Sequence, residues 1–324
     1  MTFPFNVYLA ALLSALVTTF ATLPLWRKWC LGAGLVDDPG HRKIHDAPTP
    51  LAGGLAVLTG LLLPLAAAAL VLKLDAGRIA SAGPLLYGLN KRAFQLAAIA
   101  IGAVAITILG VLDDKHELRP LPKFAGQFLI ALLVAAAGVR ITLFVPSILF
   151  SYAATVLWLL ALINAFNFMD NMNGLCGGLG AISAAQFAII AAADGQYLVA
   201  LIAFLICGAL LGFLPHNFPE ARAFLGDAGS HLIGYLLAVL AILPHFYNKL
   251  DPRPWAVISP LLVLAVPLGD LAWVVLLRWR MGQPFYIGDT NHLSHRLVRA
   301  GLSRTAAVLL IWLAAAVIGA LALL

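Results

Sequence analysis

Neighbouring carboxylates are the residues of this sequence most suited to chemistry on phosphates or metal ions. Asp113 and Asp114 are adjacent in GVLDDKHELRPLPKF, where an apolar segment ends. Two carboxylates at a helix C-terminus repel each other and oppose the helix macrodipole, so water, a lysine such as Lys115 or Lys123, or a divalent cation must offset the cost. A solvated loop at a membrane surface is the more ordinary explanation of such a pair taken alone.

A third carboxylate, Asp227, lies in FLGDAGSH immediately before another apolar segment. Capping of the following helix is the simplest interpretation of this residue in isolation. The alternative is that Asp227 and Asn167 are oxygen ligands for magnesium, which favours a few protein oxygens together with phosphates and water. Phe224 lies three residues earlier, where its ring would either stack on a base or pack as an ordinary apolar residue.

A polar stripe lies in NAFNFMDNMNGL, residues 164–175. Its members recur at every third position and are Asn164, Asn167, Asp170 and Asn173. On a helix this spacing gives one slowly drifting polar face. Polar groups at membrane depth are costly unless they face a cavity or each other. Interhelical hydrogen bonding is the alternative, but four such residues followed by glycines favour a cavity.

Two further polar segments complete the set. In GDTNHLSHRLVRAG, the residues His292, His295 and Arg296 fall within one helical turn. No carboxylate or third histidine has the spacing of a zinc site, so a pocket for phosphate oxygens is favoured. A positively charged loop beside the membrane would explain the arginines but not the histidines. Lys43 lies in the other segment, GLVDDPGHRKIHDAPTPLAGG, which by itself is only a polar loop.

The composition predicts which elements position these groups. Of the 324 residues, 62% are hydrophobic and only 10% are charged, whereas soluble domains have roughly 25% charged residues. Lipid must therefore be the main solvent, and apolar segments of about 20 residues in lipid must be helices. Ten such segments are predicted: residues 5–25, 51–74, 93–112, 124–140, 148–166, 175–193, 197–215, 229–247, 255–277 and 305–324. We expect an all-α polytopic transmembrane bundle of about ten spans, with residues 1–324 forming a single domain.

The loops alternate between the two membrane faces. When the loops are numbered in chain order, the odd-numbered ones are residues 26–50, 113–123, 167–174, 216–228 and 278–304. They contain thirteen of the 20 Lys and Arg residues, which predicts that these loops are cytoplasmic and that both termini lie outside. All five polar segments fall in odd loops and therefore on one face. The net charge of +6 is explained by this loop bias and does not indicate nucleic-acid binding. Three cysteines without C-x-x-C spacing make a disulfide framework or a zinc site improbable, and the first apolar segment lacks a basic region before it and is expected to be retained.

Taken in order, these five segments resemble the cytoplasmic motifs of the polyprenyl-phosphate N-acetylhexosamine-1-phosphate transferases, or glycosyltransferase family 4. The resemblance covers about residues 30–305. It implies magnesium-dependent transfer of a sugar-1-phosphate from a UDP-N-acetylhexosamine to a polyprenyl phosphate such as undecaprenyl phosphate, with release of UMP; manganese is an alternative metal. It also implies a bacterial inner-membrane enzyme with a cytoplasmic active site. The oligomeric state stays open, with a homodimer as one alternative.

The resemblance also implies roles for individual residues. Asp227 matches the metal-binding aspartate of the family, and Asn167 matches an asparagine that joins it in some members. Phe224 matches the aromatic residue that stacks on uracil. Catalytic roles are expected for Asp113, Asp114, Asp170 and Asp227, the first two at the acceptor. Substrate contacts are expected for Lys43, Lys123, Asn164, Asn167, Asn173, Phe224, His292, His295 and Arg296.

Two departures from the family pattern affect these expectations. Bacterial members commonly have an aspartate where this chain has Asn173, so Asn173 is not expected to act as a base. Ser294 stands within the histidine motif, and the triple histidine of the peptidoglycan enzymes is absent. This difference favours UDP-GlcNAc or a related donor over a UDP-muramyl peptide.

Two other functions are compatible with a polytopic chain. A secondary transporter would have its polar groups near the bilayer midplane between inverted repeats, whereas these groups lie at segment ends on one side. A catalytically silent scaffold of a glycan-assembly complex would explain the departures at Asn173 and Ser294. Retention of the carboxylates Asp113, Asp114 and Asp227 favours an enzyme.

Overall fold

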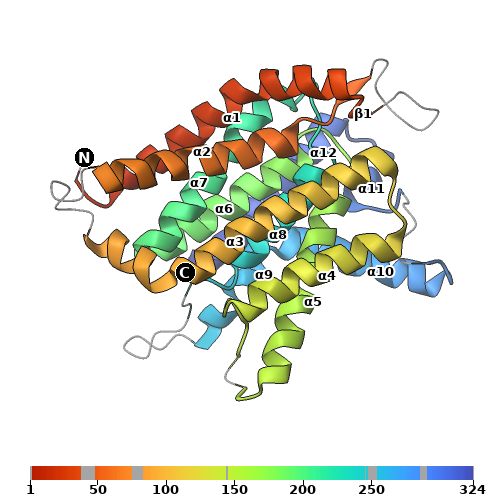
Figure 1. Cartoon of the computed structure of the whole chain (residues 1–324). Coiled ribbons are helices and arrows are strands. Elements are labelled where there is room, and N and C mark those ends of the chain that lie inside the picture. The colour runs from red at the N-terminus through yellow and green to blue at the C-terminus, as the bar shows by residue number, and fades with distance from the viewer. Residues whose placement is uncertain are drawn as a thin grey trace.

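The computed structural model describes residues 2–37, 48–74, 83–143, 145–244, 246, 254–284 and 290–323. Figure 1 shows that these residues form a bundle made almost entirely of helices, as predicted. The α-helices are α1 (Phe5–Ala33), α2 (Gly53–Leu74), α3 (Gly83–His116), α4 (Pro120–Ala136), α5 (Ile148–Met169), α6 (Leu175–Ala193), α7 (Tyr197–Phe213), α8 (Gly226–Leu240), α9 (Ser259–Val263), α10 (Ala265–Arg280), α11 (Leu293–Arg299) and α12 (Arg304–Ala320). Three short 3-10 turns are η2 (Leu214–His216), η3 (Pro254–Ile258) and η4 (Leu321–Leu323), and the strands β1 (Val36–Asp37) and β2 (Thr49–Pro50) pair in antiparallel.

Each of the ten predicted apolar segments contains a helix, but not every helix has the length of a membrane span. Among the described residues, seven helices are long and apolar enough to cross a bilayer, or eight if the bent pair around α9 and α10 is one span. That pair is broken by an angle of 68°. Helix α4 has 17 residues and α8 has 15. The chain is a polytopic membrane protein, and two of its ten predicted spans are shorter than a typical spanning helix.

The side chains that face outward match a lipid solvent. Large apolar residues are exposed along α1, α2, α3, α4, α5 and α12, and include Val17, Leu63, Ile101, Leu129, Leu157 and Leu313. Soluble proteins rarely expose so many large apolar side chains together, because water would contact them. The outer helices therefore present their apolar faces to the membrane.

Helix α8 lies at the centre of the bundle. It packs against α2, α3, α5 and α6, and all its residues from Ala228 to Leu240 are buried. Close packing at its N-terminus depends on glycines in the neighbouring helices. A Cβ atom on Gly110 of α3 would overlap the backbone of Ala228, and one on Gly54 of α2 would overlap the backbone of Gly229. These contacts bring α2 and α3 directly against the first turn of α8.

Candidate functional site

Four of the five polar segments contribute described residues to one cavity. Its volume is about 1030 Å³, and it lies where α3 and α5 end and where α8 and α12 begin. The wall contains residues from β1, the end of α3, the α5–α6 turn, the η2–α8 loop and the start of α12. Predicted site residues in the wall are Asp113, Asp114, Asn167, Asp170, Asn173, Phe224 and Asp227. These seven residues therefore lie around one cavity, whereas the membrane face on which the cavity lies stays a prediction.

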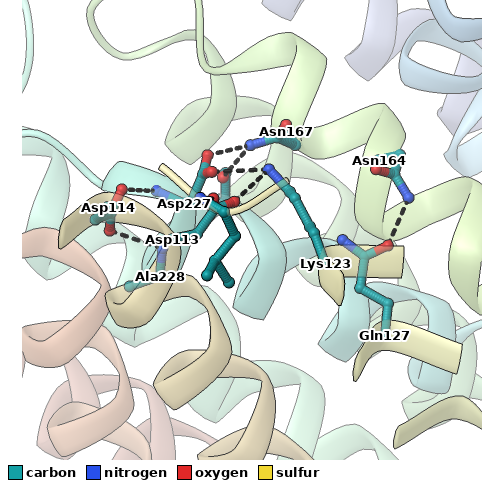
Figure 2. A network of polar contacts seen from close by, with 10 residues as sticks. Asp113, Asp114, Lys123, Gln127, Asn164, Asn167, Asp227 and Ala228 are labelled. Atoms are coloured by element: carbon teal, nitrogen blue, oxygen red, sulfur yellow. Dashed lines mark hydrogen bonds and ion pairs between the residues drawn. The ribbon is translucent and has the colours of Figure 1, made fainter. Parts of the chain in front are cut away.

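Asp114 binds the N-terminus of α8. Its Oδ1 accepts a hydrogen bond from the backbone N–H of Asp227 at 2.7 Å, and its Oδ2 accepts one from Ala228 at 3.1 Å (Figure 2). The first N–H groups of a helix have no partners within the helix and attract negative charge. Gly226 permits this approach because it has a φ of 67° and because a Cβ atom there would lie 2.6 Å from Asp114 Oδ2. Asp114, rather than Asp227, is therefore the capping carboxylate of α8.

Because Asp114 caps α8, the carboxylate of Asp227 interacts with side chains from other helices. Its Oδ2 accepts a hydrogen bond from Lys123 Nζ at 2.8 Å, and the same ammonium lies 2.6 Å from Asp113 Oδ2 (Figure 2). The side chains of Lys123, Asp113 and Asp227 are 18%, 7% and 29% exposed. A lysine from α4 thus neutralises carboxylates from α3 and α8 in a mostly dry environment. Asp113 Oδ1 also accepts from the backbone N–H of Leu118 at 2.9 Å, which fixes its orientation.

The residues of the polar stripe do not all contact the same partners. Asn167 Nδ2 donates to Asp227 Oδ1 at 2.6 Å and to Ser230 Oγ at 3.1 Å. Asn164 turns towards α4, where its Nδ2 donates to Gln127 Oε1 at 2.9 Å (Figure 2). The prediction of one helical face over all four residues is wrong, because α5 ends at Met169. Asp170 and Asn173 lie in the turn that follows.

Asp170 is a buried carboxyl group surrounded by other carboxylates. Burial is the main cause of a rise in the pKa of Asp170 to about 8, and the nearby carboxylates of Asp227, Asp114 and Asp37 contribute to the same rise. The carboxyl group therefore holds its proton near neutral pH as long as no cation enters the cavity. Charge neutralisation by a cation or a basic residue would favour its ionised form.

The nucleotide-side candidates lie at the edge of the cavity. Asn173 Nδ2 donates to the carbonyl of Pro219 at 3.2 Å. The backbone of Phe224 pairs with the turn before α2: its N–H donates to Pro50 O at 3.0 Å, and its carbonyl accepts from Gly53 at 2.8 Å. These backbone contacts hold the ring of Phe224 in the cavity wall.

The histidine segment lies beside this cavity rather than in its described wall. His292 Nδ1 is 2.7 Å from Asp270 Oδ2 of α10, and the guanidinium of Arg296 lies 4.7 Å from the ring centroid of Trp273. The ring of His295 is 6.3 Å from that of His292. Ser294 connects the segment to the cavity, because its Oγ donates to Oδ1 of the wall residue Asn171 at 2.7 Å. Lys43 lies outside the described residues.

Several site residues were not predicted. Arg304, the first residue of α12, lines the cavity, although the sequence shows it only as one of many loop arginines. Asn217 supports two loops, since its Oδ1 accepts from the N–H of Gly174 at 2.6 Å and its Nδ2 donates to Ala223 O at 2.9 Å. His231 follows Asp227 by four residues on α8, and this spacing in the sequence indicates that the two share a helix face.

A divalent cation fits the donor groups that converge here. Oxygen atoms of Asp113 and Asp227 and a ring nitrogen of His231 all lie within 4.8 Å of one another. The amide of Asn167 is close enough to join them but directs its nitrogen, not its oxygen, at Asp227. Rotation of this amide by half a turn would present the oxygen that a metal ligand requires.

Comparisons with known proteins identify the family of this chain. Residues 96–245 match the model of glycosyl transferase family 4. The chain is 35% identical over 331 residues to the decaprenyl-phosphate N-acetylglucosaminephosphotransferase of Mycobacterium tuberculosis strain H37Rv, covering 94% of this chain and 79% of that one. It is 28% identical over 323 residues to the undecaprenyl-phosphate alpha-N-acetylglucosaminyl 1-phosphate transferase of Escherichia coli strain K12, covering 94% and 81%. With similarity at this level over nearly its whole length, this chain belongs to glycosyl transferase family 4.

Proposed function

We propose that this chain transfers N-acetylglucosamine-1-phosphate, or a closely related N-acetylhexosamine-1-phosphate, from a UDP-sugar to a polyprenyl phosphate. The products are UMP and a polyprenyl-diphosphate-sugar. The relatives are named for transfer to decaprenyl or undecaprenyl phosphate. The observation that supports the proposal most directly is the group of Asp113, Lys123 and Asp227, which contact one another at the cavity.

The arrangement suits phosphoryl transfer between two anionic substrates. Such a reaction needs positioning and charge neutralisation more than covalent help from the protein. Lys123 and Arg304 supply positive charge at the site and hold phosphate oxygens, while Asp113 orients the acceptor. A phosphate monoester is already largely ionised near pH 7, so removal of a proton by Asp113 is not required.

The metal in this proposal is magnesium, with manganese as the alternative, and Asp227 and Asn167 are its ligands. Bound there, the cation would stabilise the negative charge that develops on the UMP leaving group. Asp114 contributes indirectly, because its two hydrogen bonds to the backbone of α8 fix the position of Asp227.

The two substrates approach from different phases. Phe224 and Asn173 provide an aromatic face and an amide for the uridine, and Asp170, Asn171 and Asp227 line the same cavity. The acceptor phosphate lies at headgroup depth and its prenyl tail lies among the outer helices. We place the cavity on the cytoplasmic face of a bacterial inner membrane, with both termini outside.

A transferase assay tests the proposal. The purified full chain would be incubated with radiolabelled UDP-GlcNAc, polyprenyl phosphate and magnesium, and labelled lipid and UMP would be measured. Equal formation of both products is expected. Absence of turnover with UDP-GlcNAc and with a panel of other UDP-N-acetylhexosamines would contradict the proposal. Asp227→Asn should remove most of the turnover, while the variant still elutes as a folded protein in size-exclusion chromatography.

A further inference from the structure

His231 is a buried histidine whose ring has no evident structural task. Its exposed fraction is 0%, and among the described residues neither ring nitrogen has a hydrogen-bond partner. Leaving a polar ring buried without a partner costs free energy, so most buried polar groups in proteins are paired. A histidine that serves only as core packing would be replaced at lower cost by leucine or methionine. A partner that is not among the described residues is therefore expected.

The position of His231 identifies that partner. His231 follows Asp227 by four residues on α8, so both side chains lie on one helix face. Its ring nitrogen and oxygens of Asp113 and Asp227 lie within 4.8 Å of one another. Octahedral ligands of a single cation, bound at about 2.0–2.2 Å, lie about 3 Å apart when adjacent and about 4.4 Å apart when opposite. Side-chain rotations that move the ligand atoms by about one to two ångströms, with the backbone unchanged, would thus place all three groups on one ion.

Lys123 shows that positive charge is already stabilised between the two carboxylates. Its ammonium lies 2.6 Å from Asp113 Oδ2 and 2.8 Å from Asp227 Oδ2. A divalent cation bound by the same oxygens takes the place of this ammonium, and the flexible lysine side chain is then available for phosphate.

We propose that His231 is a nitrogen ligand of the divalent cation in addition to Asp227, with Asp113 as a further carboxylate ligand before the acceptor binds, and that it makes the site favour manganese, the alternative metal named above, over magnesium. The proposal rests on the metal-dependent function proposed above. Magnesium strongly prefers oxygen ligands, whereas imidazole nitrogen is a good ligand for transition metals. Replacement of one oxygen by nitrogen therefore favours Mn²⁺ in competition with Mg²⁺.

Pulsed electron paramagnetic resonance of bound Mn²⁺ tests the ligand directly. The full chain would be purified without an added histidine tag and loaded with about one equivalent of Mn²⁺. Electron spin echo modulation from a directly bound nitrogen is expected, and it should change when the protein is grown with ¹⁵N-labelled histidine. A spectrum of wild-type protein with only oxygen and water couplings would overturn the proposal without the need for any variant.

Metal titration provides the second test. His231→Met keeps an apolar side chain of similar bulk and should weaken Mn²⁺ binding at least about tenfold, as loss of ligand-shell groups commonly does, while Mg²⁺ binding changes less than about threefold. His116→Gln is the matched control, because His116 is exposed in the last turn of α3, three residues from Asp113. Equal losses for the two metals, or an equal effect of the control, would contradict a selective nitrogen ligand.

The two proposals fail in different ways. Nitrogen coupling without turnover of any UDP-N-acetylhexosamine would retain His231 as a ligand and reject the transferase function. Turnover without nitrogen coupling would retain the transferase and reject His231 as a ligand.

Discussion

At the scale of single residues, Lys123 neutralises two carboxylates that would otherwise repel each other at the cavity. Its ammonium is the positive charge in contact with Asp113 and Asp227, and all three side chains are largely shielded from water. In such an environment the mutual repulsion of two carboxylates is much stronger than in bulk solvent. The protein without metal therefore depends on Lys123 to keep these carboxylates close together.

We expect Lys123→Met to make stability depend on a divalent cation. Without metal the variant should unfold at a lower temperature than the wild type, and added Mg²⁺ or Mn²⁺ should raise its unfolding temperature more than that of the wild type. Turnover should fall about 10²-fold, the usual effect of removing a group that stabilises developing charge. Tryptophan fluorescence during heating measures the first effect. Lys115→Met, at the exposed end of α3, serves as the control, and a metal response equal to that of the wild type would contradict this account.

Asp170 gives a pH-dependent prediction. Its pKa is about 8 in the folded chain against an ordinary value of 3.8, with burial as the main cause. Between these two values the folded chain holds a proton that the unfolded chain has lost. The contribution of Asp170 to the free energy of unfolding therefore falls as the pH rises through this interval and becomes constant above about pH 8.

Asp170→Asn removes this titration. We expect the unfolding temperature of the variant, minus that of the wild type, to increase by a few degrees from about pH 5 to about pH 8 in the absence of metal and nucleotide. Asp194→Asn provides the comparison, because Asp194 is an exposed residue after α6. A difference that stays constant with pH would show that Asp170 is ionised throughout.

At the scale of the elements, the first turn of α8 is held by groups from other helices. Asp114 of α3 accepts two of its backbone N–H groups, whereas the residue at the N-cap position, Leu225, has no side-chain acceptor. A carboxylate from a neighbouring helix thus does the work that a local Ser or Asp does in most helices. This cap also couples the position of α3 to the orientation of Asp227.

Asp114→Asn should therefore act mainly through structure. An amide oxygen accepts one of the two hydrogen bonds, but the amide nitrogen cannot accept the other. We expect a loss of about 1–3 kcal/mol in unfolding free energy and a smaller loss of turnover than Asp113→Asn causes. Denaturant titration of both variants, together with the transferase assay, separates the two effects. Turnover lost in Asp114→Asn without any loss of stability would assign Asp114 a direct chemical role instead.

The glycine contact between α3 and α8 is a second element-scale test. Gly110→Ala would drive a methyl group into the backbone of Ala228, so we expect a loss of about 1–3 kcal/mol in stability and a loss of activity as the carboxylates of α3 move away from Asp227. Gly32→Ala in α1 is the matched control, since no atom lies within 4 Å of its added Cβ. The control should be as stable as the wild type or slightly more so. Equal behaviour of the two variants would show that α3 and α8 separate easily.

Across the whole molecule, the sequence predicts the helices better than it predicts the contacts between them. Apolar segments of bilayer length in a chain with few charges can only be helices, so the all-α bundle follows from composition. The number of apolar segments between the polar segments predicts a common membrane face for them, and the cavity brings four of the five together. The short length of α8 does not, because its apolar sequence resembles that of a lipid-facing span although protein surrounds it.

At the site, too, the sequence predicts residue types better than it predicts their contacts. The acidic residues Asp113 and Asp227 are recognisable by type and spacing, but the capping role of Asp114 depends on the position of α8 in three dimensions. Asn164 fits a regular pattern, but it donates to Gln127 of α4 instead of lining the cavity. The pattern also continues past the end of α5 at Met169, so its last two members lie in a turn. Arg304 is one of many basic loop residues until the fold brings the start of α12 to the cavity.

The burial of α8 on all sides has a consequence for motion. A helix surrounded by α2, α3, α5 and α6 opens only when much of the bundle opens, so its amide hydrogens should be among the slowest in the chain to exchange with heavy water. We therefore expect α8, which carries Asp227, to keep its position during the catalytic cycle. Entry of a long lipid and release of a nucleotide must instead be accommodated by the outer segments around the cavity, while the centre stays still.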